Sequence, residues 1–148
     1  MDGQFFIDRI GKPIETPEVS AMLAQVGVTE QLRMPQDDID ARADLPGQGL
    51  SLIFKPEAPR SSRLVFYAVQ FFSDVEPDHA RFAGALPGGI SFDDDQGRVH
   101  GKLGAPVSSK PNLRRDFWDM GSLRLSVKYA KTEPNRVAVV AVQLPLES

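Results

Sequence analysis

The fold is decided by a stretch that occurs twice in the chain, as RLVFYAVQF at residues 63–71 and as RVAVVAVQL at residues 136–144. The copies align without gaps, and an arginine and an Ala-Val-Gln triplet recur at equivalent positions, 73 residues apart. Both are rich in β-branched and aromatic residues, which is typical of buried central strands. Two related central strands predict a sheet made of two similar units.

Helices are predicted before the strands of each unit. The segment 16–18 reads Thr-Pro-Glu, which suits a capped helix start, and apolar residues with helical spacing follow, so a helix is expected at residues 17–26. In the second unit the acidic run 93–95 is a capping cluster for a shorter helix that ends at Gly104. A further short helix is expected at residues 3–10.

Strands are predicted where apolar residues alternate or run continuously. Their ranges are 39–44, 50–54, 63–72, 117–118, 123–127 and 137–144, and residues 108–115 are expected to form a polar loop. Short connections favour antiparallel pairing, and the helices are too few for parallel crossovers. The expected fold is therefore α+β, an antiparallel sheet of about six strands with helices on one face, made of two similar helix–β–β–β units. The other face would be solvated or would dock a partner.

The length of 148 residues fits a single domain, 1–148, whose internal units span approximately 11–72 and 86–145. The polar segment between them carries several prolines and glycines and reads as a connection. Phe82 and Leu86 are expected to pack into the core from this connection.

The composition excludes several classes of protein. The chain has no cysteine, which rules out disulfides, thiolate catalysis and cysteine-ligated zinc. No signal-peptide core or membrane span is apparent, so a cytoplasmic protein without a membrane partner is expected. The net charge of −3 argues against nucleic-acid binding. The densest basic spot, Arg114-Arg115 with Lys110, reads as a solvated turn.

No catalytic motif, cofactor-binding motif or metal signature stands out, and the chain is expected not to be an enzyme. His79 is expected at the surface, and His100 is expected to pack or to make a helix-end hydrogen bond. The serines at 61–62 and 108–109 fall in predicted loops without a nearby base. No catalytic, metal or cofactor-binding residues are therefore assigned.

Two acidic zones are the candidate partner-binding residues. They comprise Asp37, Asp38, Asp40 and Asp44 in the first zone, and Asp74, Glu76 and Asp78 in the second. Acidic clusters are commonly solvated surface. They can also dock a basic protein, because complementary charge raises the association rate and selects partners.

Several short motifs resemble a bacterial family. The resemblance lies in Ile10-Gly11-Lys12-Pro13, in residues 49–54 (GLSLIF), in residues 86–92 (LPGGISF), in Leu103-Gly104-Ala105-Pro106 and in Trp118-Asp119. Together they are similar to small immunity proteins that neutralise secreted bacterial toxins. The Leu-Gly-x-Pro element also resembles β-lactamase-inhibitor-like repeats and small outer-membrane assembly lipoproteins, although the chain lacks the lipobox cysteine of the latter.

The resemblance implies a function of stoichiometric binding, in which the chain covers a cognate toxin, possessing no catalytic residues of its own. The expected partner is then a protein, such as a basic toxin domain, and the chain would be a monomer or a homodimer. Two alternatives stay open: an accessory or scaffold domain of a bacterial envelope or secretion system, and a small ligand-binding domain or enzyme. A deep pocket lined by His100 or Trp118 and two carboxylates would favour the last alternative.

Overall fold

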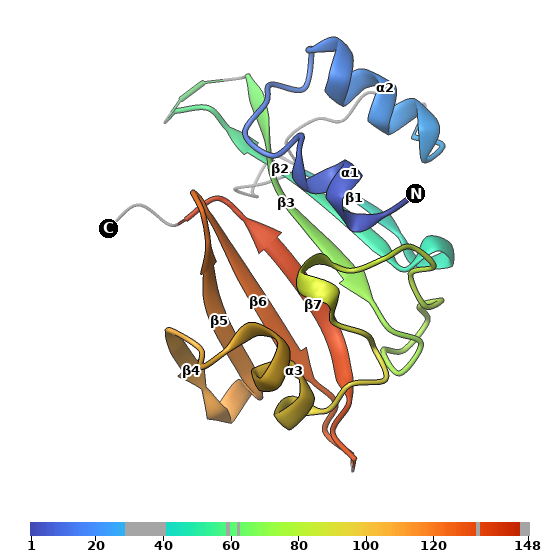
Figure 1. Ribbon diagram of the computed structural model, residues 1–148. Helices are drawn as coiled ribbons and strands as arrows, with labels where there is room; N and C mark the ends of the chain where they lie inside the picture. Colours follow the sequence, from blue (N-terminus) through green and yellow to red (C-terminus); the bar gives the residue numbers. More distant parts are fainter. Residues whose placement is uncertain (29–40, 59, 62, 133, 146–148) are drawn as a thin grey trace.

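The described residues form a single antiparallel sheet with three α-helices (Figure 1). The computed structural model describes residues 1–28, 41–58, 60–61, 63–132 and 134–145. The α-helices are α1 (Gly3–Ile7), α2 (Pro17–Gln25) and α3 (Gln96–Leu103). The strands are β1 (Ala41–Leu45), β2 (Leu50–Pro56), β3 (Leu64–Phe72), β4 (Ser108–Lys110), β5 (Arg115–Met120), β6 (Leu123–Tyr129) and β7 (Val137–Gln143). The 3-10 turns are η1 (Pro46–Gln48), η2 (Pro87–Gly89) and η3 (Pro111–Leu113).

The sheet has seven strands in the order β1-β2-β3-β7-β6-β5-β4, rather than about six. The α+β class and the antiparallel pairing are confirmed. The additional strand is β4, which lies in the segment 108–115 that was expected to be a polar loop. All three β4 residues are exposed, so no apolar alternation marks them, and the strand exists because it pairs with β5 beyond the turn η3.

The two long strands β3 and β7 pair with each other at the centre of the sheet, and Val69 faces Val142 directly. These two valines occupy equivalent positions of the duplicated stretch. Matching hydrogen bonds close the flanking hairpins: Glu57 N donates to Arg63 O at 2.8 Å, and Ala130 N donates to Arg136 O at 2.7 Å. The donors and the acceptors of these two bonds are again 73 residues apart.

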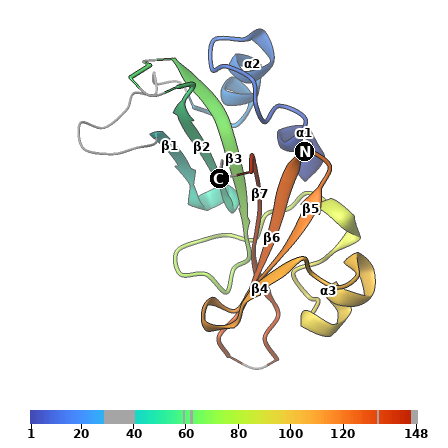
Figure 2. The ribbon, with the colours of Figure 1, turned by 90° about the vertical axis from the view of Figure 1, so that its left-hand side faces the viewer.

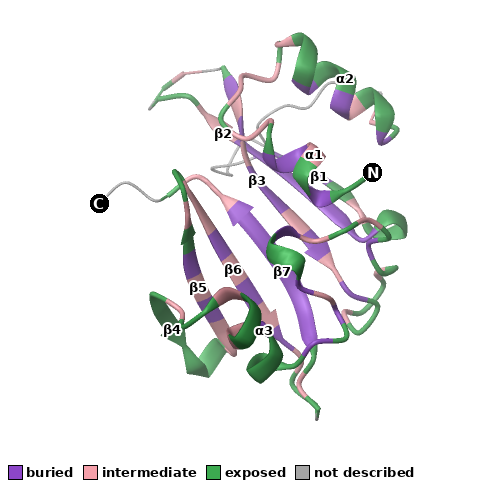
Figure 3. Ribbon diagram, in the orientation of Figure 1, coloured by how far each residue is buried: buried purple, intermediate pink, exposed green. Residues whose placement is uncertain are grey.

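The helices lie on one face of the sheet, as Figures 1 and 2 show, and the main core fills the space between them. Phe6 of α1 packs edge-on against Phe71 of β3 and Phe82 of the connection, with ring centroids 6.1 and 6.2 Å apart. Phe82 is buried and Leu86 is partly buried against the core, so both predictions are confirmed. Figure 3 shows that β7 is buried along most of its length. Within the described ranges, no helix is long and apolar enough to cross a membrane.

The opposite, helix-free face of the sheet is covered only in part. After β3 the chain turns onto this face: the ring of His79 stacks on Phe72 with centroids 4.1 Å apart, and Glu76 lies 3.6 Å from the ammonium of Lys128. Phe82 then returns to the helix side of the sheet, where its ring packs against that of Phe6. Among the described residues, the connection thus covers one end of the helix-free face.

The starts of α2 and α3 differ in their capping. The side chain of Asp95 accepts a hydrogen bond from Arg98 N at 2.9 Å, as the acidic run predicts. Thr16 occupies the N-cap position of α2, but its hydroxyl donates to Pro13 O at 2.7 Å and makes no cap. The expected Thr16 cap is therefore wrong, because the hydroxyl is engaged by the preceding turn.

Removing the side-chain cap of α3 should weaken the fold modestly. Asp95→Ala leaves the Arg98 amide without its acceptor, and we expect a loss of about 1 kcal/mol in the free energy of unfolding. Thr16→Ala, at the matching position of α2, serves as the control and should lose less. Urea denaturation of both variants measures the difference, and an equal loss in both would contradict the assignment of the cap.

Candidate functional site

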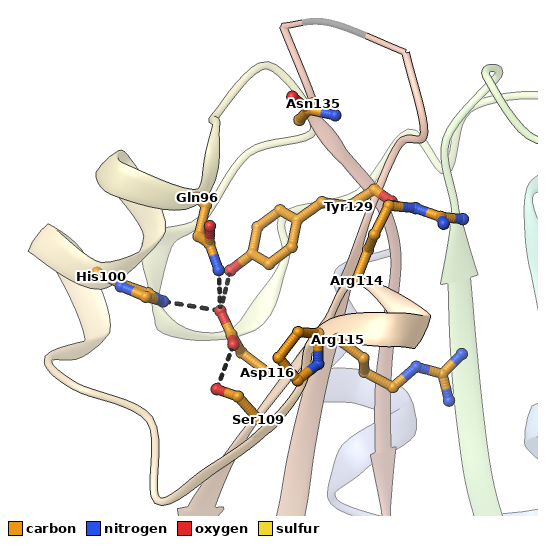
Figure 4. A pocket seen from close by; sticks show the side chains of 9 residues that line it. Gln96, His100, Ser109, Arg114, Arg115, Asp116, Tyr129 and Asn135 are labelled. Atoms are coloured by element: carbon orange, nitrogen blue, oxygen red, sulfur yellow. Dashed lines mark hydrogen bonds and ion pairs between the residues drawn. The ribbon is translucent and has the colours of Figure 1, made fainter.

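A pocket of about 370 Å³ opens beside α3, β4 and the start of β5 (Figure 4). Its lining combines one carboxylate with several neutral polar and cationic side chains. The lining residues are Gln96, His100, Ser109, Pro111, Arg114, Arg115, Asp116, Tyr129 and Asn135. They come from one helix, three strands and two turns, so only the folded sheet brings them together.

Asp116 is the centre of this pocket, and its side chain is only 3% exposed. Its Oδ1 accepts a hydrogen bond from Ser109 Oγ at 2.6 Å. Its Oδ2 accepts from His100 Nε2 at 2.7 Å, from Gln96 Nε2 at 3.0 Å and from the Tyr129 hydroxyl at 3.0 Å. These four bonds tie α3, β4 and β6 to β5 and satisfy a charge that would otherwise be costly to bury.

The hydrogen bonds also set the ionisation of the pocket. Burial alone would raise the pKa of Asp116, but the hydrogen bonds from Ser109, Gln96, His100 and Tyr129 outweigh it and hold the pKa below its ordinary value. Burial, and then the Asp116 carboxylate, raise the pKa of Tyr129 above its ordinary value. At neutral pH the pocket therefore holds an ionised carboxylate and a neutral phenol that donates to it.

Acidification should destabilise the fold through Asp116. Because its folded pKa lies below that of an unfolded aspartate, about 3.9, the carboxylate contributes its full stability above that value. The contribution is lost as the pH falls through the folded pKa. Asp116→Asn cannot ionise and should show a lower melting temperature at neutral pH and a shallower decline between about pH 6 and pH 2. Equal declines in thermal melts of both proteins would exclude Asp116 as the source.

The geometry of the pocket suits structural hydrogen bonding better than nucleophile activation. Ser109 and His100 both bond to the same carboxylate, whereas an activated serine needs the histidine between itself and the acid. The expectation that Ser109 lies in a loop without a nearby base is wrong, since Ser109 lies on β4 and donates a hydrogen bond to the Asp116 carboxylate. His100 bonds across to β5 rather than to a helix end.

Two features expected of a ligand-binding or catalytic pocket are only partly present. His100 lines the pocket, but Asp116 is the single carboxylate in its lining. Trp118 is buried nearby, and its Nε1 donates to Gly104 O at 3.2 Å. Over the described part of the chain, no group of three or more histidine, cysteine or acidic side chains could hold a metal ion.

The structure describes only four of the seven residues of the two acidic zones. Asp37, Asp38 and Asp40 lie outside the described residues. Asp44 lies on β1, where it pairs with Arg42 at 3.4 Å, and Asp74 pairs with Arg81 at 3.2 Å. Glu76 pairs with Lys128 at 3.6 Å, and Asp78 is exposed at a turn with φ of 65°. Three of the four described acidic residues therefore face a basic side chain of their own domain.

A second set of polar residues gathers on the helix-free face of β4, β5 and β6. The register places Lys110, Arg115 and Lys128 in one cross-strand row. Phe117 lies in the next row and Arg124 in the row after it. We call Lys110, Arg115, Phe117, Arg124 and Lys128 the free-face cluster. The Lys110 ammonium lies 5.6 Å, and the Arg124 guanidinium 5.9 Å, from the centroid of the Phe117 ring.

The two arginines of the free-face cluster have unused hydrogen-bonding capacity. The Nε atoms of Arg115 and Arg124 are shielded from solvent and have no hydrogen-bond partner among the described residues. Asp119 faces Arg124 in the register, yet within the described ranges no ion pair joins them. The prediction of a solvated turn at Lys110 and Arg115 missed this surface, because Arg124 and Lys128 reach it from another strand.

The Asp116 carboxylate and the free-face cluster thus lie on opposite faces of β5, since Asp116 and its neighbours Arg115 and Phe117 alternate along the strand. Arg115 belongs to the cluster and also reaches the edge of the pocket. In Figure 4, Arg115 extends away from the Asp116 network. Comparison of the chain with protein-family models, with curated proteins and with solved structures found no match.

Proposed function

We propose that this chain is a non-catalytic binding protein that acts on a protein partner, in the manner of an immunity protein that neutralises a bacterial toxin. The observation that supports the proposal most is the free-face cluster, an aromatic ring with cations beside it on a face that the described residues cover only in part. Arginine and aromatic side chains are enriched at protein interfaces and contribute much of their binding energy. The toxin-neutralising role rests on the sequence resemblance.

The Asp116 carboxylate accepts four hydrogen bonds from its own chain, which is in keeping with binding rather than catalysis. A general base needs a free lone pair directed at a substrate proton, and both oxygens of Asp116 already accept hydrogen bonds. Ion pairs within the domain also reduce the charge that Asp44, Asp74 and Glu76 offer to a basic partner. We therefore place the docking surface on the free-face cluster rather than on the acidic zones.

The proposal keeps the two-unit organisation of the framework. The matched hairpin hydrogen bonds and the facing valines, Val69 and Val142, are what an approximate two-fold axis between β3 and β7 would produce. Under that axis β2 corresponds to β6 and β1 corresponds to β5. Among the described residues β4 has no counterpart, and it contributes both Ser109 to the pocket and Lys110 to the free-face cluster.

The functional test is rescue of growth. The gene next to the one that encodes this chain is expressed under an inducible promoter, with and without this chain. An immunity protein should restore growth in proportion to its amount, because it acts stoichiometrically. Toxicity that persists at excess of this chain would reject the immunity role, and a neighbouring product that binds without being inhibited would favour an accessory or scaffold domain.

A second candidate function is small-ligand binding in the Asp116 pocket. The supporting observation is the cavity itself, which falls within the size range of small-molecule sites and is rimmed by Arg114 and Asn135. A thermal-shift screen of small anions tests this candidate. Stabilisation that Asn135→Leu abolishes would support the pocket, and no stabilisation by any anion would reject it.

A further inference from the structure

We propose that the free-face cluster docks an acidic segment of the partner protein, with carboxylates over Arg115 and Arg124 and an apolar side chain against Phe117. This inference rests on the proposed function, because it names the chemistry of the partner's contact surface. The partner's contact surface is then acidic, whereas docking on the acidic zones would require a basic partner.

Charge is the first argument for an acidic partner. The chain as a whole carries a net charge of −3, yet four of the five residues of the free-face cluster are basic. Glu76 pairs with Lys128 alone, so Lys110, Arg115 and Arg124 have no acidic partner among the described residues. Salt screens charges beyond roughly 8 Å, so the cluster attracts a partner whose negative charges lie directly against it, even though the chain as a whole is acidic.

Hydrogen bonding is the second argument. The shielded Nε atoms of Arg115 and Arg124 are orphan donors on two adjacent strands. Carboxylates bind the guanidinium group in a side-on, bidentate manner that uses the Nε together with a terminal nitrogen. Because the Nε atoms are shielded from solvent, an acidic segment satisfies these donors only when the two arginine side chains turn toward it on binding.

Net charge favours a protein segment over a nucleic acid. The chain carries a net charge of −3, which opposes the binding of a polyphosphate backbone. A second copy of this chain is disfavoured, because a two-fold contact through the cluster would bring like charges together.

The test uses the full chain and an acidic probe peptide in which glutamate and aspartate alternate with leucine. Amide chemical-shift perturbation should map its binding to β4, β5 and β6. Arg115→Gln combined with Arg124→Gln should raise the dissociation constant of the peptide about tenfold, because two charge contacts of roughly 0.7 kcal/mol each are lost. Arg42→Gln combined with Lys55→Gln removes two basic residues from the first half of the sheet and should leave binding within about twofold.

A second variant covers the case in which the double arginine change alters the fold. Ser108 is exposed and faces Phe117, so Ser108→Glu adds a carboxylate beside the cluster and should weaken the peptide without harming the sheet. No binding by the wild-type chain, equal weakening in the control pair, or tighter binding of a pyrimidine oligonucleotide than of the peptide would each overturn the inference. Failure of growth rescue with normal peptide binding would count against the proposed function alone.

Discussion

Val69→Asp should unfold the domain, and Val142→Asp should do the same. Both side chains are fully buried at the centre of the sheet, and they face each other across β3 and β7. Each substitution places a carboxylate in an apolar core without a partner and forfeits the burial of a valine. The combined cost, about 5 kcal/mol or more, is comparable to the whole stability of a typical domain.

Circular dichroism and thermal melting of the two variants measure this effect. Val75→Asp is the matched control, because Val75 is 54% exposed and tolerates a charge. The control should melt within a few degrees of the wild type. If either core variant retained the wild-type melting temperature, the pairing of β3 with β7 at the centre of the sheet would be wrong.

Asp116→Ala should be the most damaging change among the polar residues. It leaves four donors, on Ser109, Gln96, His100 and Tyr129, facing an empty space. Removing a buried, hydrogen-bonded charge of this kind costs about 3 to 5 kcal/mol, because each donor then lacks its acceptor.

Asp119→Ala is the control for this prediction, since Asp119 lies on the same strand and is exposed. Its loss should stay within about 0.5 kcal/mol. Urea denaturation of both variants gives the free energies, and amide hydrogen exchange should show that α3 loosens in the Asp116 variant. A variant as stable as the control would mean that the network does not hold α3 to the sheet.

The central strands were predictable because their residues carry the signal locally. Apolar runs rich in aromatic and β-branched residues mark β3 and β7, and Pro17 with the apolar stripe behind it marks α2. The strand β4 was not predictable in this way. Its three polar residues have no periodicity, and its pairing depends on the turn η3 and on β5.

The candidate sites were harder to predict because their members are distant in the sequence. The Asp116 network joins Gln96, Ser109 and Tyr129 from three separate elements. One local signal was available. Asp116 and Trp118 both occupy core-facing positions of the alternation along β5, and a charged residue at such a position needs buried hydrogen-bond partners. The sequence predicted a free sheet face in general terms, but only the register shows that Arg115 and Arg124 share it.

Titration calorimetry of this chain with the purified product of the neighbouring gene tests the proposed protein binding most directly. We expect a one-to-one complex whose dissociation constant rises about tenfold when Arg115 and Arg124 are both replaced by glutamine. The paired change of Arg42 and Lys55 should leave that constant nearly unchanged. Equal affinity of all three proteins would contradict docking on the free-face cluster, and the absence of any complex with the wild-type chain would contradict the binding function itself.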